Sequence, residues 1–332
     1  MLLSSLLLLS LTSTPPVCRP AAFCRPVRPH PLQMSADSSS TGPLGGLASA
    51  MEVARLATEE SAAAARFVAR TYSADFEEGK LGKADASPVT VADFAVQAIV
   101  CKRLLDAFPD DPVIAEEAAD ELRKDNNLLA RVTEAVRVVV PSATAEEVCT
   151  WIDRGIERQY RERSWTLDPI DGTKGFVRRE QYALCLALLE RGVPVVGVLA
   201  CPNLALSLEV PDSAKGTLFC AYDGGGAWQM AMPDGRVDEA ERTRMQLQEN
   251  VKPAESLRFC ESVEAAHSNH ALSGQIAKAL NITRPPIRFD SQVKYGLMAR
   301  GDADLYLRLP NFQRSGLFGA TYQENIWCGA YW

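Results

Sequence analysis

Two aspartates that stand three residues apart could bind a metal ion. Asp168 and Asp171 flank Pro169 and Ile170 within residues 164–176, which read Ser-Trp-Thr-Leu-Asp-Pro-Ile-Asp-Gly-Thr-Lys-Gly-Phe. The apolar residues before Asp168 predict the end of a buried strand, and Pro169 stiffens the corner that follows. Two carboxylates beside the Ile170 carbonyl form a set of hard oxygen donors. Such a set suits Mg²⁺ better than zinc, since no histidine or cysteine accompanies it.

The residues after the second aspartate could hold an anion. Gly172 permits a backbone geometry that a side chain would resist, and Thr173 is placed to cap a following helix. The first N–H groups of such a helix would face a bound phosphate group. The simpler alternative is an Asp-Gly turn followed by a capped helix, with no chemical role.

A further carboxylate stands near the start of a predicted helix. Ser87-Pro88 marks a turn, Thr90 is the predicted N-cap, and the helix runs through Leu105. Asp93 would then lie in the first helical turn, where the helix dipole favours a carboxylate. It could serve in chemistry or only compensate the dipole.

A pair of glutamates follows a short apolar run. Val113–Glu117 predicts a short strand that ends in Glu116 and Glu117. Two acids at a strand end are solvated surface, metal ligands or a general base.

Composition excludes several classes of protein. The net charge of −7 argues against a general nucleic-acid binder. The nine cysteines form no Cys-x-x-Cys pair, which indicates buried thiols in a reducing compartment rather than a disulfide framework or a zinc site. After residue 45 only His267 and His270 are available to a Ser-His-Asp hydrolase, and no Gly-x-Ser-x-Gly elbow accompanies them. Chemistry by carboxylates and a metal ion is the better hypothesis.

The first 45 residues have the composition of a targeting leader. Met1–Leu11 is apolar but too short to span a bilayer, and the stretch that follows is rich in Pro, Ser and Arg, with no acid before Asp37. The apolar start is typical of a secretory signal and the acid-free stretch of a transit peptide. Both together predict a plastid reached through the secretory route; a mitochondrion is the alternative, and a tail with no address is the third possibility.

The remaining pattern predicts an α/β fold in two domains, residues 46–245 and 246–332. Hydrophobic periodicity predicts helices at 45–72, 128–140, 145–156, 271–280 and 292–300. A β-hairpin is predicted over 182–200 with Arg191-Gly192 as its turn, and further strands at 206–210, 217–222, 227–232, 257–260, 287–289 and 303–309. The 332-residue length allows two domains. The boundary is placed in the charged segment 234–255.

The segments that carry carboxylates resemble a known family. The Asp93 segment, the Glu116-Glu117 pair and Asp168-Pro-Ile-Asp-Gly-Thr173 are similar, in this order, to the metal-dependent, lithium-sensitive phosphatases of the inositol monophosphatase superfamily. Residues 261–268 (Glu-Ser-Val-Glu-Ala-Ala-His-Ser) and 290–310 narrow the resemblance to its 3′(2′),5′-bisphosphate nucleotidase branch.

The resemblance implies both a fold and an activity. The fold would be the layered αβαβα arrangement of these sugar phosphatases, with a metal site between two domains. The activity would be hydrolysis of adenosine 3′,5′-bisphosphate to AMP and phosphate, often with its sulfated analogue as a second substrate, and with inhibition by lithium and sodium. We expect a monomer that acts on a small molecule, without a nucleic-acid polymer as partner and without stable membrane association.

The resemblance also implies roles for individual residues at the metal. Glu116, Asp168, the Ile170 carbonyl and Asp171 would hold Mg²⁺, with Asp168 bridging two ions. Asp93 and Thr173 would orient the attacking water and take its proton.

On the substrate side, Thr173, His267, Ser291 and Lys294 match positions that touch the nucleotide. Arg308 matches the position that receives the other phosphate, for which a guanidinium fork is well suited.

The sequence departs from the family near its end. Cys328 stands after Trp327, where the family has a metal-binding aspartate. The last helix and strands of the family pattern are expected to be missing, so the end of the chain is predicted to be truncated or divergent. Two alternatives to the nucleotidase therefore stay open: an inositol polyphosphate 1-phosphatase of the same fold, and a catalytically inactive truncated form.

Overall fold

The computed structural model describes residues 46–72, 88–157, 161–210, 212–246, 252–264 and 269–307. All of them belong to one compact unit, Ser40–Trp332. The predicted leader, His267, Arg308 and Cys328 lie outside the described residues, so organelle targeting and the divergent ending stay predictions. The division into two domains near residue 245 also stays a prediction.

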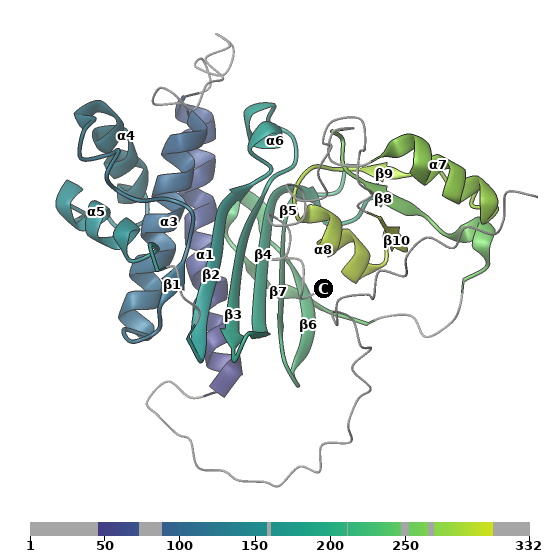
Figure 1. Cartoon of the computed structure of the whole chain (residues 1–332), viewed down its shortest axis with the longest axis horizontal. Helices are drawn as coiled ribbons and strands as arrows, with labels where there is room; N and C mark the ends of the chain where they lie inside the picture. The colour runs from purple at the N-terminus through teal and green to yellow at the C-terminus, as the bar shows by residue number, and fades with distance from the viewer. Residues whose placement is uncertain are drawn as a thin grey trace, which may run out of the picture. The chain divides into compact units, whose positions relative to one another are not determined.

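A seven-stranded sheet forms the centre of the described structure (Figure 1). Its strands are adjacent in chain order: β1 Val113–Ile114, β2 Arg163–Asp171, β3 Ala183–Glu190, β4 Val193–Ala205, β5 Lys215–Tyr222, β6 Gly226–Ala231 and β7 Asp238–Met245. Only β1 and β2 pair in parallel; the other neighbours are antiparallel.

Helices cover one face of this sheet. α1 (Gly46–Thr71) packs on β3, β4 and β5, and α3 (Pro88–Ala107) packs on α1 and β2. α4 (Asn126–Arg137) and α5 (Ala145–Asp153) pack on the far side of α3, which therefore lies between them and the sheet (Figure 1). The apolar side chains of this face and of α1 and α3 form the larger hydrophobic core.

A second, three-stranded sheet and helix α8 lie on the other face of the large sheet. β8 (Phe259–Glu261) pairs in parallel with β9 (Ile287–Arg288) and β10 (Leu305–Tyr306), and α7 (His270–Ala279) belongs to the same part of the chain. α8 (Val293–Arg300) contacts both β4 and β8. Along β3, Leu184 and Leu186 face the larger core, whereas Ala183 and Cys185 face the smaller core beside α8. Both faces of the sheet are thus buried, and the layered α/β class is confirmed.

Most predicted elements are present. α1 matches the predicted first helix, and β3 and β4 form the predicted hairpin. Its turn residues Arg191 and Gly192 have φ of 51° and 75°, which is the backbone that a two-residue hairpin turn requires.

The charged segment 234–255, for which no strand was predicted, contains the exposed edge strand β7; all-polar edge strands show no apolar alternation. Three predictions about helix and strand positions are wrong. The strand predicted at 206–210 is absent, because β4 continues to Ala205 and the chain then bends. Thr90 is inside α3, which begins at Pro88, because proline fits a first helical turn. Thr173 is likewise not a cap but the first residue of α6 (Thr173–Val177), after Gly172.

The six cysteines of the described residues are free and buried, as the sequence predicts. Burial raises the pKa of Cys101, Cys220 and Cys260 to about 12 each, so these thiols stay protonated. Among the helices that the structure describes, none is long and apolar enough to cross a membrane.

Candidate active site

Glu116 and Asp168 lie at the same edge of the large sheet. β1 and β2 are parallel, with Val113 opposite Trp165 and Ile114 opposite Thr166. The last residues that pair between β1 and β2 are Ile114 and Thr166. Glu116 and Asp168 each stand two positions after them. Because the carboxyl ends of parallel strands meet at one edge, two distant segments place their acids at the same edge of the sheet.

α3 positions the loop that carries the glutamates. Gln97 is fully buried, and its side-chain amide donates to the Glu117 carbonyl at 2.7 Å and accepts from the Glu117 N–H at 3.0 Å. The same amide donates to the Ile152 carbonyl at 2.9 Å. Gly155 leaves room for it, since a Cβ there would lie 2.6 Å from the Gln97 Nε2. The glutamate loop is therefore fixed to the helix that carries Asp93.

Asp93 stands one turn before Gln97 on α3 and is half-buried. The first turn of the helix contains no acidic residue. The dipole effect fades beyond that turn, so the prediction that Asp93 lies in the first turn is wrong and dipole compensation does not explain it.

A β-bulge shapes the aspartate corner. On β2, Asp168 is opposite Cys185 and Asp171 is opposite Ala183, so one extra residue on β2 is accommodated between them. A bulge bends the strand and re-aims its side chains. Both carboxylates are half-buried, and Ile170 between them is 2% exposed.

The corner touches the segment that begins at Asp290. Gly172 has a φ of 87°, and a Cβ there would lie 2.7 Å from the Ser291 Cβ. The Asp171 carboxylate accepts a hydrogen bond from the Gln292 N–H. Two predicted site segments, separated by more than a hundred residues, are thus in direct contact.

Ser291 and Lys294 have structural partners in this contact. Lys294 is 4% exposed, and its ammonium donates to the Ser291 carbonyl at 2.6 Å and the Phe289 carbonyl at 3.1 Å. Ser291 has a left-handed backbone with φ of 65°, and its hydroxyl accepts from the Val293 N–H. Lys294 therefore holds the turn that presents Ser291; contact of either residue with a nucleotide stays a prediction.

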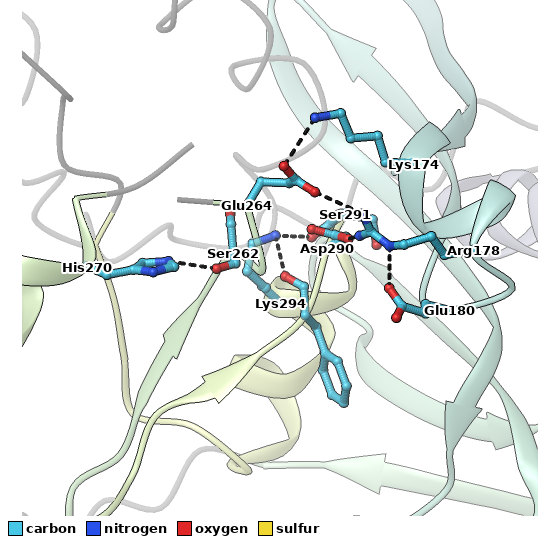
Figure 2. A network of polar contacts seen from close by, with 10 residues as sticks. Lys174, Arg178, Glu180, Ser262, Glu264, His270, Asp290, Ser291 and Lys294 are labelled. Atoms are coloured by element: carbon cyan, nitrogen blue, oxygen red, sulfur yellow. Dashed lines mark hydrogen bonds and ion pairs between the residues drawn. The ribbon is translucent and has the colours of Figure 1, made fainter. Parts of the chain in front are cut away.

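A network of charged residues surrounds this contact (Figure 2). Glu264 accepts from Lys174 at 3.1 Å and from Arg178 at 2.9 Å. Arg178 also pairs with Glu180 at 2.6 Å and with Asp290. These hydrogen bonds lower the pKa of Glu264 and raise that of Arg178. The amino-acid sequence does not predict this network; its only sign there is the four-residue spacing of Lys174 and Arg178, which suits one face of a helix.

The predicted metal ligands are oxygen donors at one edge. Two half-buried carboxylates on a bulged strand, with a carbonyl between them and a third carboxylate in the loop after the neighbouring strand, are the kind of oxygen donors that suit a hard cation such as Mg²⁺. Within the part of the chain that the structure describes, no three His, Cys, Asp or Glu side chains are gathered closely enough to hold a metal ion by themselves.

Several known proteins are similar to this chain in amino-acid sequence. The pattern of the inositol monophosphatase family matches residues 49–327. A 3′(2′),5′-bisphosphate nucleotidase of Schizosaccharomyces pombe is 44% identical over 261 residues, which cover 75% of this chain and 71% of the relative. 3′(2′),5′-Bisphosphate nucleotidase 1 of Arabidopsis thaliana is 37% identical over 291 residues, covering 82% and 79%. The chain therefore belongs to the inositol monophosphatase family.

Solved structures of the family are also similar to the chain. CysQ from Bacteroides thetaiotaomicron, a bacterial member of the family, is 23% identical with a TM-score of 0.49 and covers 78% of this chain and 79% of its own. Mycobacterium tuberculosis SuhB is 21% identical with a TM-score of 0.47, over 78% of this chain and 76% of its own.

Proposed function

We propose that the protein is a Mg²⁺-dependent 3′(2′),5′-bisphosphate nucleotidase, which hydrolyses the 3′ phosphate of adenosine 3′,5′-bisphosphate to give AMP and phosphate. The names of the relatives support this substrate. The observation that carries the proposal is that the segments of Glu116 and Asp168 leave the sheet at the same edge, while the corner at Asp171 and Gly172 contacts the Ser291 segment. The sulfated analogue is proposed as a second substrate.

The proposed metal ligands are Glu116, Asp168, Asp171 and the Ile170 carbonyl. Bound Mg²⁺ supplies a more acidic water and charge to stabilise the leaving oxygen. The chain's own contribution is positioning. The Gln97 amide fixes the glutamate loop, and the Gln292 N–H fixes the Asp171 carboxylate.

The proton of the attacking water goes to a residue of the chain. Asp93 on α3 and the exposed Thr173 at the start of α6 are the proposed groups that orient the water and accept its proton. A half-buried carboxylate can accept the proton, and a threonine hydroxyl can orient the water by a hydrogen bond.

The test compares substrates in the presence of Mg²⁺. The protein should release phosphate from adenosine 3′,5′-bisphosphate faster than from inositol 1,4-bisphosphate or inositol monophosphate. A preference for inositol 1,4-bisphosphate would instead support the inositol polyphosphate 1-phosphatase alternative. No release from any of them would favour the inactive form.

The metal corner is tested by Asp168→Asn, which would remove one carboxylate charge from the proposed metal ligands while preserving shape. We expect turnover to fall by about a thousandfold or more, with an unchanged unfolding midpoint. Asp223→Asn is the matched control, since Asp223 is exposed and lies outside the site. Normal turnover of Asp168→Asn would show that the corner is only a turn.

A further inference from the structure

A basic cavity lies beside α6, apart from the residues proposed for catalysis. Its volume is about 520 Å³, and Arg66, Arg70, Arg179 and Lys215 line it. Among the described residues that line the cavity, Asp234 is the only acidic one. These described residues carry four cations and one anion in a chain whose net charge is −7, so the positive charge is a local feature rather than a reflection of composition.

Arg66 is held in place by backbone groups. Its guanidinium donates to the Pro202 carbonyl at 3.0 Å and the Met232 carbonyl at 3.3 Å. Gly216 leaves the room that this requires, because a Cβ there would lie 2.9 Å from the Arg66 Nη2. No carboxylate of the described residues forms an ion pair with Arg66. The guanidinium is therefore fixed by backbone carbonyls rather than by an ion pair with a described residue.

Burial makes that charge unfavourable without a ligand. Desolvation lowers the pKa of Arg66; Tyr182 and Asp234 raise it, Arg70 lowers it, and the net effect is a lowered pKa. An anion in the cavity would offset this net effect, because an opposite charge within a few ångströms favours the charged form.

Tyr182 adds a hydrogen-bond donor that lacks a partner. It lines the cavity and is 2% exposed, and no described residue forms a hydrogen bond with its hydroxyl. Burial raises the pKa of Tyr182, so the hydroxyl keeps its proton. An anion bound in the cavity could accept a hydrogen bond from this hydroxyl.

We propose that this cavity is a second anion site, which binds the phosphate or sulfate group of a small molecule. A guanidinium fixed by carbonyls, three further cations and a buried phenol match a tetrahedral oxyanion, whose several oxygens accept charge-assisted hydrogen bonds. The volume exceeds the size of one such ion, so an ester of modest size also fits. None of its lining residues is a proposed metal ligand or substrate contact, so the site does not depend on the proposed catalytic function.

The experiment measures anion binding by calorimetry to the full chain. EDTA is present, so that Mg²⁺ does not recruit phosphate to the carboxylate edge, and ionic strength is held constant with KCl. Inorganic phosphate, sulfate and glycerol phosphate are the three probes, which separate a site for the free ion from a site for an ester. We expect binding of at least one probe to the wild type.

Two variants test the assignment. Arg70→Gln with Lys215→Gln removes two exposed cations from the cavity and should weaken binding about tenfold or more. Tyr182→Phe removes only the hydroxyl and should weaken it about fivefold. The matched control, Lys124→Gln with Lys278→Gln, removes two exposed cations elsewhere and should bind as the wild type does. No binding by the wild type, or equal binding by the wild type and the Arg70/Lys215 variant, would overturn the proposal.

Discussion

The two sides of the candidate active site are built by different physical means. The edge that carries Glu116 and Asp168 is fixed by strand pairing, by the fully buried Gln97 and by the larger apolar core. On the other side, the segment around Asp290 meets α6 through charges: the side chains of Lys174 and Arg178 are 62% and 36% exposed, and that of Glu264 is 24% exposed. The carboxylate edge should therefore resist changes of salt and pH that loosen the other side.

Typical energies support this difference. Truncating a large buried aromatic side chain costs about 3–5 kcal/mol, whereas an exposed ion pair contributes about 0–1 kcal/mol. The charged contacts therefore fix the orientation of the Asp290 segment more than they add to the free energy of unfolding. Mutations can test the contrast, beginning with the largest expected effect.

Trp165→Ala should be the most destabilising change. Trp165 is fully buried on β2, and its indole N–H donates to the Asp111 carboxylate at 3.0 Å. We expect a loss of about 3–5 kcal/mol in the free energy of unfolding, measured with urea. Trp228→Ala on the strand next to the sheet edge is the control and should cost less, because Trp228 is only half-buried. Equal losses would contradict the importance of the carboxylate edge.

A comparison of Gly172→Ala with Gly192→Ala should separate the energetic cost of backbone strain from the cost of a steric contact. Gly172 and Gly192 both have positive φ, 87° and 75°, but only at Gly172 would a Cβ meet a neighbour, the Ser291 Cβ at 2.7 Å. Gly192→Ala should cost about 1 kcal/mol from strain alone. Gly172→Ala should cost about 2–3 kcal/mol and also impair turnover, because the corner shifts away from Ser291. If both variants behaved alike in urea, the close contact would have no energetic role.

Arg178→Met should show, through the salt dependence of its melting temperature, how much the charged network stabilises the protein. The wild-type network weakens as salt screens it, so the melting temperature of the variant should approach that of the wild type at 1 M NaCl. At low salt we expect a loss of about 1 kcal/mol or less. Arg137→Met is the control, since Arg137 bonds a backbone carbonyl, that of Ala143. A salt-independent difference between wild type and Arg178→Met would show that packing, not charge, holds this contact.

Glu264 should give the smallest effect, and it should depend on pH. Hydrogen bonds from Arg178 and Lys174 lower its pKa from the ordinary value of 4.5. The stability from this group is therefore complete above pH 4.5 and is lost as the pH falls through the lowered value. Glu264→Gln should lower the melting temperature slightly at neutral pH, where the charged contacts are complete, and should flatten the decline of melting temperature below pH 4.5. A larger loss at pH 4 than at pH 8 would reverse the assigned sign.

Local patterns predicted the parts of the molecule that depend on neighbours in the sequence. The hairpin over β3 and β4 follows from two apolar runs around Arg191-Gly192, and α1 follows from its apolar periodicity. β7 escaped prediction because every residue from Asp238 to Arg244 is exposed, so no apolar pattern marks it.

The sequence predicted which residue types form the candidate site, but not the contacts that support them. The acids of the corner are visible as a spacing, whereas the Gln97 amide, the Gln292 N–H and the Arg178 network join residues that are distant in the chain. Such partners depend on how the elements pack, and no local propensity encodes them. Lys294 illustrates the limit, since its position was singled out but its bonds to two carbonyls were not foreseen.

The two-residue strand β1 also has a dynamic consequence. It lies at the edge of the sheet, and the Trp165 N–H donates to the Pro112 carbonyl at 2.9 Å. An edge strand this short can open locally without unfolding the rest of the sheet. Each opening would release Glu116 from the neighbourhood of Asp168, so the amide hydrogen exchange of Trp165 would report how often the carboxylate edge comes apart in the native ensemble.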